Sequence, residues 1–234
     1  MNELQDAFRE RLFPPAEDRD SIFVSAEASR RWMPPSAVGP FGFDLPLGAK
    51  GALRIMDDVS QGQMDANTGR ILAVDGEWRL NTIADRRHAL TLHSNHADWS
   101  RPSPLISADA SPYSTITRAR RYQTKRRGPA HVSLINNKAR LRAGHPTLSA
   151  YDEMVHYGVD DPYLRNHEYF RSQILYPYAV LEEEIVGTWD WLEVEEVLRE
   201  SGTDAWVQFL REQLERHEQA ALQEWRSNHP VMQV

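Results

Sequence analysis

The chain has 234 residues, 41% of them hydrophobic and 26% charged, which is enough for one large domain with extensions. It contains no cysteine, which excludes disulfides, thiol nucleophiles and cysteine-ligated metal sites. A net charge of −7 argues against nucleic-acid binding by the molecule as a whole. No apolar run of about 18 residues and no secretory signal are apparent, so we expect no membrane contact and a cytoplasmic location, reached by synthesis there or by delivery into a target cell.

The first 50 residues predict a proline-rich arm. Two short amphipathic stretches end at Pro14-Pro15 and at Pro34-Pro35, and residues 36–48 are rich in proline and glycine, as in irregular segments. We therefore place an arm with short helices at 1–50, a main domain at 51–195 and a helical extension at 196–234.

The first half of the main domain alternates between strand and helix patterns. Alternating or short apolar runs predict three strands, at 52–56, 104–107 and 130–136. Helical spacing predicts helices over about 78–94 and 111–127. The second helix has a serine N-cap followed by proline, at Ser111-Pro112, and ends before Gly128-Pro129.

The second half predicts further strands and a terminal helix. A short helix is expected over 148–158, followed by strands over 168–175 and 184–194. Thr203 and Asp204 can cap an amphipathic terminal helix. Short strands close together favour an α+β fold over a doubly wound parallel sheet. The sequence lacks both the GxGxxG and the GxxxxGK[ST] loops, so any nucleotide would be bound in another way.

Three segments carry candidate chemistry: Leu53-Arg54 on the first strand, Leu105-Ile106-Ser107 before a helix, and Asn166-His167-Glu168 before the tail QILYPYAVLEEEIVGTW. Their order resembles that of the Arg–Ser–Glu class of ADP-ribosyltransferases, which includes cholera toxin and heat-labile enterotoxin. The stretches RIMDDVS and HADWSRPSPLIS also resemble a group of enterotoxin-like domains found in fungi and some bacteria. The resemblance covers roughly residues 50–195.

This resemblance implies split antiparallel sheets around an NAD cleft. It implies an NAD-dependent ADP-ribosyltransferase or NAD glycohydrolase, such as a toxin or effector. NAD would be the substrate, and ADP-ribose would pass to an acceptor in a protein or nucleic acid, or to water. An immunity or regulatory protein is a further partner that such a protein would have.

The resemblance also assigns roles to individual residues. Arg54 would hold the NAD pyrophosphate, since its planar fork can donate two hydrogen bonds to one phosphate. Ser107 would orient the nicotinamide ribose or the catalytic glutamate. Glu168 would be catalytic, because a carboxylate on the ribose stabilises the oxocarbenium-like transition state. One of His93 and His96 would contact the adenosine side.

Two departures from the family pattern bear on activity. The family's Ser-Thr-Ser triplet reads Ser107-Ala108-Asp109, and the residue two before Glu168, which helps to choose the acceptor, is Asn166 rather than Glu or Gln. One alternative is therefore a catalytically inactive ADP-ribosyltransferase-like domain that binds or regulates.

Other patterns have simpler interpretations. His93 and His96 are spaced i, i+3 rather than i, i+4, so no metal site is predicted. Residues 118–127 hold six cations and no acid, with Arg118, Arg121 and Lys125 on one helix face. Such a face is usually only solvated, but it leaves a second alternative, a nucleic-acid-associated protein that uses this helix.

Overall fold

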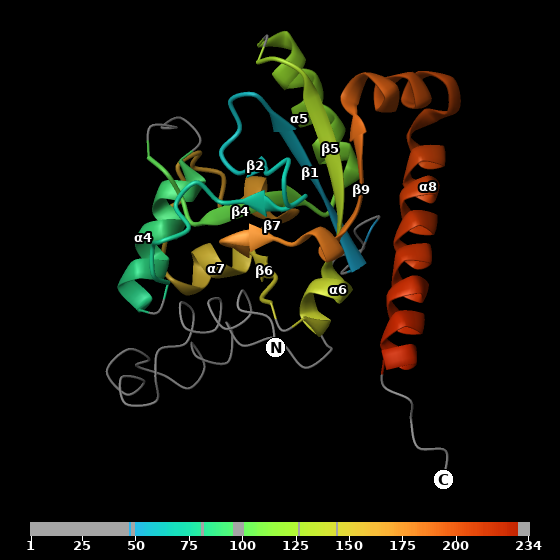
Figure 1. Ribbon diagram of the computed structural model, residues 1–234. Helices are drawn as coiled ribbons and strands as arrows, with labels where there is room; N and C mark the ends of the chain where they lie inside the picture. Colours follow the sequence, from blue (N-terminus) through green and yellow to red (C-terminus); the bar gives the residue numbers. More distant parts are fainter. Residues whose placement is uncertain are drawn as a thin grey trace.

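The computed structural model describes residues 47, 50–80, 82–95, 101–125, 127–143 and 145–228, with the main chain alone for 224–228 (Figure 1). The predicted arm at 1–50, apart from Leu47 and Lys50, and His96 lie outside the described residues. None of the described helices is both long enough and apolar enough to cross a bilayer.

Two antiparallel sheets form the centre of the fold. The larger has the strand order β6-β7-β4-β1-β5-β9 and the smaller has the order β2-β3-β8. The strands of the larger sheet are β1 Gly51–Asp57, β4 Leu105–Asp109, β5 Ala130–Asn136, β6 Leu148–Ser149, β7 Gln173–Pro177 and β9 Ile185–Asp190. Those of the smaller sheet are β2 Gln63–Met64, β3 Ile71–Leu72 and β8 Ala179–Val180. Antiparallel sheets combined with helices confirm the predicted α+β class.

The larger sheet opens between β1 and β4. Strand β1 pairs with β5 along its whole length, but it pairs with β4 at the single position Leu53↔Asp109. Figure 1 shows the consequence: β1, β5 and β9 run steeply, whereas β4 and β7 run across them. Beyond Leu53 and Asp109 the two strands therefore leave space between them.

Helices cover the two halves of this sheet. They are α4 Ile83–Ser94, α5 Pro112–Thr124, α6 Asn137–Arg142, α7 Ala150–His156 and α8 Trp191–Asn228, with 3-10 turns η3 Glu168–Phe170 and η4 Glu182–Glu184. As predicted, α5 begins with Ser111 as its N-cap and Pro112 in its first turn.

Two predicted strands are partly wrong. The prediction over 168–175 covers η3 and then β7, which begins only at Gln173. The prediction over 184–194 ends early, because β9 stops at Asp190 and α8 starts at Trp191. Helix α8 is bent at Gly202, whose φ of 82° is a conformation that favours glycine.

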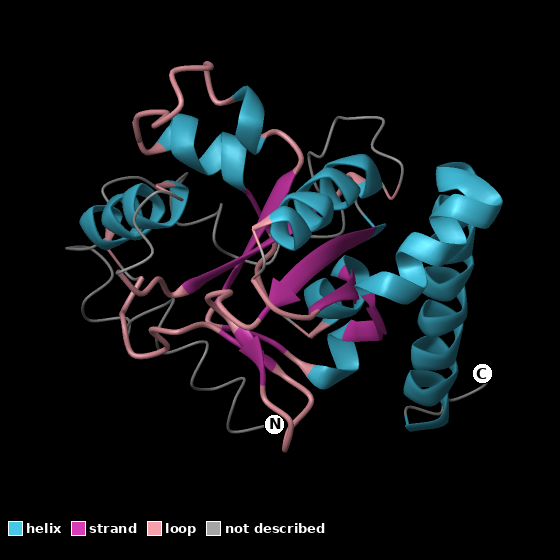
Figure 2. Cartoon of the chain, turned by 90° about the horizontal axis from the view of Figure 1, so that it is seen from above, coloured by secondary structure: helices cyan, strands magenta, loops and turns pink. Residues whose placement is uncertain are grey.

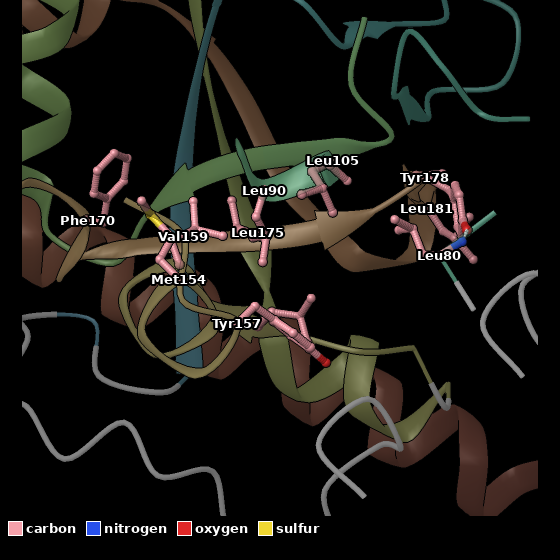
Figure 3. Close-up of a cluster of buried hydrophobic side chains, with 14 residues drawn as sticks. Leu80, Leu90, Leu105, Met154, Tyr157, Val159, Phe170, Leu175, Tyr178 and Leu181 are labelled. Carbon is pink, nitrogen blue, oxygen red and sulfur yellow. Dashed lines mark hydrogen bonds between the residues drawn. The ribbon is translucent and has the colours of Figure 1, made fainter. Parts of the chain in front are cut away.

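Three buried apolar clusters hold these elements together. One joins α4 and α7 to β4 and β7, and Figure 3 shows Leu90, Leu105, Met154 and Leu175 in it. A second lies between the two sheets. The third packs α5 and α8 against β1 and β5 and includes Trp206, Leu210 and Leu214. The described part of the C-terminal extension thus packs one face on the core, and Figure 2 shows it along one side of the molecule.

A buried ion pair ties α6 to the segment between β8 and β9. Arg140 Nη1 and His145 Nδ1 each lie 2.6 Å from a carboxylate oxygen of Glu184, and the main-chain N–H of Leu181 donates to the same group. Arg140 also donates to the main-chain oxygens of Pro146 and Ala179. Burial alone would raise the pKa of Glu184, but these partners outweigh it and hold the pKa below its ordinary value.

Candidate functional site

A pocket of about 670 Å³ lies where β1 and β4 diverge. Its volume falls within the range of small-molecule sites, about 300–1,000 Å³. Strand β1 contributes Leu53, Arg54 and Ile55, and β4 contributes Ser107, Ala108 and Asp109. The remaining walls come from the ends of α4 and α5, from the segments that follow β1 and precede β4, and from the segment between α7 and β7.

Arg54 lies buried at the base of this pocket. Its guanidinium donates to the main-chain oxygens of Ser107 at 2.6 Å, of Gly62 at 2.9 Å and of Gln61. Burial, the largest effect, lowers the pKa of Arg54 to about 10, so the side chain is still charged at neutral pH. Arg54 Nε is buried and has no hydrogen-bond partner among the described residues. The side chain therefore joins β1 to β4 through its terminal nitrogens.

Ser107 and His93 line the same pocket. Ser107 is half-buried on β4, next to the guanidinium of Arg54. His93, in the last turn of α4, lies with Nδ1 3.1 Å from Ser103 Oγ. Three of the predicted site residues thus come together, although they lie on three separate elements.

Glu168 does not line the pocket. It lies on η3, its side chain is 56% exposed, and it forms an ion pair with Arg171 at 2.5 Å. The prediction put this residue on a strand, but the strand begins five residues later. The sequence of β7, QILYP, contains no carboxylate, and its first residue, Gln173, is buried opposite Asp109.

Asp109 is the carboxylate of the pocket, and no role was assigned to it from the sequence. Arg118 Nη2 lies 2.9 Å from Oδ2, and the Ser172 hydroxyl donates to Oδ1 at 2.5 Å. Burial, the largest effect, raises the pKa of Asp109, and Arg118 and Ser172 offset only part of this. Asp109 could have been identified from the sequence, because it ends β4 two residues after Ser107 and lines the same pocket.

Positive charge dominates the pocket. Seven cationic side chains line it, and Asp109 is the one acidic residue among its described lining residues. The cations are Arg54, Arg101, Arg118, Arg121, Lys125, Arg127 and Arg165. Because the protein as a whole carries a net charge of −7, this concentration is local and favours an anionic ligand.

Three tyrosines also line the pocket. Tyr163 and Tyr169 contact each other edge to face, with ring centroids 5.0 Å apart. Tyr122 carries the Arg127 guanidinium over its ring at 4.0 Å. Aromatic faces next to cations are suited to nucleobases joined to phosphates.

A tight loop over residues 161–167 supplies Tyr163 and Arg165 to the pocket lining. The carboxylate of Asp161 accepts hydrogen bonds from the main-chain N–H groups of Tyr163, Arg165 and His167, at 2.7–2.9 Å. Asn166 is exposed in this loop and, like His167, has a positive φ. Asn166 itself does not line the pocket, whereas Tyr163 and Arg165 do.

The described residues contain no group of three or more His, Cys, Asp or Glu side chains that could hold a metal ion. No protein-family model matches the chain, and no curated protein matches it. Among solved structures, the chain is similar to a protein named EcPltA, with a TM-score of 0.40 and 16% sequence identity. The match covers 60% of this chain and 75% of that one. What the chain binds must therefore be inferred from the pocket's own residues.

Proposed function

We propose that the chain is an NAD-binding protein with an ADP-ribosyltransferase-like fold, and that it binds the dinucleotide without cleaving it. The observation that carries the proposal is the position of Arg54 and Ser107. They meet across diverging strands at the base of a pocket rich in cations and tyrosines. These are also the two residues that the sequence resemblance assigns to NAD binding.

The pocket offers a suitable group for each part of the dinucleotide. Guanidinium groups suit the pyrophosphate, because they donate paired hydrogen bonds to phosphate oxygens. The exposed ring of Tyr163 suits the planar adenine or nicotinamide ring. The hydroxyl of Ser107 and the imidazole of His93 suit the ribose hydroxyls.

The placement of carboxylates favours binding over cleavage. Breaking the nicotinamide–ribose bond builds positive charge on the sugar, which a free carboxylate would stabilise. Glu168 lies outside the pocket, and both oxygens of Asp109 are already engaged by Arg118 and Ser172. We therefore rank the binding or regulatory module ahead of the transferase.

Calorimetric titration of the full chain with NAD tests binding. We expect saturable binding by the wild type and binding about three- to tenfold weaker in Ser107→Ala, which loses one hydrogen bond. Arg120→Ala is the control, because Arg120 lies on α5 outside the pocket and pairs with Glu195. A folded wild-type protein that does not bind NAD would contradict the proposal.

Nicotinamide release tests the absence of cleavage. We expect none from the wild type, with or without a cell lysate as a source of acceptors. Release that disappears in Glu168→Ala would restore the predicted transferase.

A second candidate function is NAD cleavage assisted by Asp109, which is favoured by its place in the pocket. This function predicts that the wild type releases nicotinamide, that Asp109→Asn does not, and that Glu168→Ala still does.

A further inference from the structure

Six of the seven cations of the pocket, all except Arg101, fall into two groups. Those at its base and walls have partners: Arg54 donates to main-chain oxygens, Arg118 pairs with Asp109, and Arg127 pairs with Asp57 at 2.6 Å. In contrast, Arg121, Lys125 and Arg165 are exposed, and no ion pair joins them to any described residue. We call these three residues the rim cations.

The rim cations lie on two walls of the pocket. Arg121 and Lys125 are on the last turns of α5 and at its C-cap, and Arg165 is on the loop centred on Asp161. Unlike two of the cations at the base and walls, these three side chains are not paired with a carboxylate of a described residue, so their charge is open to the phosphates of a ligand. Three such cations on two walls can contact several phosphates along a backbone.

Aromatic side chains lie next to this charge. Tyr163, 36% exposed, belongs to the same loop as Arg165 and packs edge to face on Tyr169. Tyr122 follows Arg121 on α5 and also lines the pocket. Cations that follow a backbone, together with aromatic rings on which bases stack, are the features that bind single-stranded nucleic acid. A pocket of about 670 Å³ admits one unstacked base but no duplex. An acidic peptide would use the charge and leave the rings without a function.

We infer that the pocket also binds a single-stranded nucleic acid, with phosphates on the rim cations and one base among the tyrosines. This inference rests on the proposed function only in that the pocket accepts a nucleotide. It explains why this one region is basic in an otherwise acidic protein. It also implies that NAD and the strand compete, because both place a planar ring in the same pocket.

Fluorescence anisotropy with labelled single strands of about 12 nucleotides tests the inference, using DNA and RNA of the same mixed sequence. We expect the wild type to bind at least one of them, with an affinity that falls as salt rises. The double variant Arg121→Ala/Lys125→Ala, called the rim variant, should bind the strand at least about tenfold more weakly than the wild type. Its salt slope, the slope of log affinity against log salt concentration, should be smaller in magnitude by about 1.4. Tyr163→Ala should weaken binding by about fivefold or more and leave the salt slope unchanged.

Arg120→Ala is the matched control, since Arg120 is an exposed cation on the same helix but outside the pocket. It should bind the strand within about twofold of the wild type. Absent binding, equal binding of a duplex, or equal loss in Arg120→Ala and in the rim variant would each overturn the inference. Displacement of the strand by polyglutamate at an equal charge concentration would also overturn it, in favour of an acidic protein partner.

The failures of the two proposals can be told apart. NAD titration of the rim variant should show a smaller loss of affinity than the strand does, because Arg54 and Ser107 are intact. A protein that binds NAD but no single strand would overturn this inference alone. A protein that binds the strand but not NAD would overturn the proposed function alone.

Discussion

Arg54 on β1 and Ser107 on β4 are joined by a 2.6 Å hydrogen bond between the guanidinium and the main-chain oxygen of Ser107, at the point where the two strands separate. The same guanidinium also holds the main-chain oxygens of Gln61 and Gly62. One side chain thus fixes two walls of the pocket.

Arg54→Lys should lower both stability and ligand affinity. A lysine ammonium cannot reach three carbonyls from one fork, so buried acceptors lose their partners at a cost of about 1–3 kcal/mol. We expect a melting temperature lower by about 3–10 °C and NAD binding lost or severely weakened. Differential scanning fluorimetry and calorimetry would measure the two effects. Unchanged values would show that the strands do not depend on this residue.

Glu168→Ala should leave NAD affinity unchanged and shift the melting temperature by no more than about 2 °C. Its carboxylate is more than half exposed, and its partner Arg171 also lies near the surface. Exposed pairs of this kind contribute little. A large loss of affinity would show that η3 rearranges when the ligand binds.

Glu184→Gln should destabilise the protein strongly, by about 3–5 kcal/mol. The substitution leaves the charge of Arg140 buried without its counter-ion, because both side chains are fully buried. Urea denaturation would measure the loss. The matched control is Glu183→Gln, one residue earlier and exposed, which should change little.

Acid should destabilise the wild type through Glu184. The folded-state pKa of this group lies below its unfolded value of about 4.3, so its contribution is present above that value and is lost as the pH falls through the folded-state pKa. Asp109 acts in the opposite direction, since its pKa is raised. Urea midpoints between about pH 3 and pH 6 should therefore fall less steeply in Glu184→Gln than in the wild type.

Trp206→Ala should cost about 3–5 kcal/mol, because the indole is buried between α8 and the sheet. Leu192→Ala, at an exposed position on the same helix, is the control. A small effect of Trp206→Ala would mean that α8 contributes little to the core.

Local chemistry explains which elements could be predicted. Ser111 and Pro112 begin α5 because a cap depends on its immediate neighbours. The strand predicted over 130–136 has the bounds of β5, although both faces of that strand are buried. The apolar residues Phe170 and Ile174 suggest one continuous strand, but Phe170 belongs to a 3-10 turn packed in a different cluster. Sequence spacing does not distinguish these two arrangements.

Burial of charge could not be predicted in the same way. Glu184 is indistinguishable from Glu182 and Glu183 until α6 brings Arg140 and His145 to it. Asp109 likewise depends on α5 and on Ser172 for its partners. The meeting of Arg54 and Ser107 was expected only from the order of the motifs, whereas helical spacing predicted that Arg121 and Lys125 share a helix face. Arg165 lies on a loop and was not predicted to join them.

The position of α8 has a consequence for synthesis on the ribosome. Leu53, near the start of the described domain, shares an apolar cluster with Trp206 and Leu214, near its end. The nascent chain cannot complete this cluster until α8 has left the exit tunnel. Until then, the apolar face of β1 and β5 that α8 covers in the folded protein stays exposed to solvent. Long-range closure of this kind slows folding and exposes surface to aggregation, which makes the emerging polypeptide a candidate for chaperone assistance.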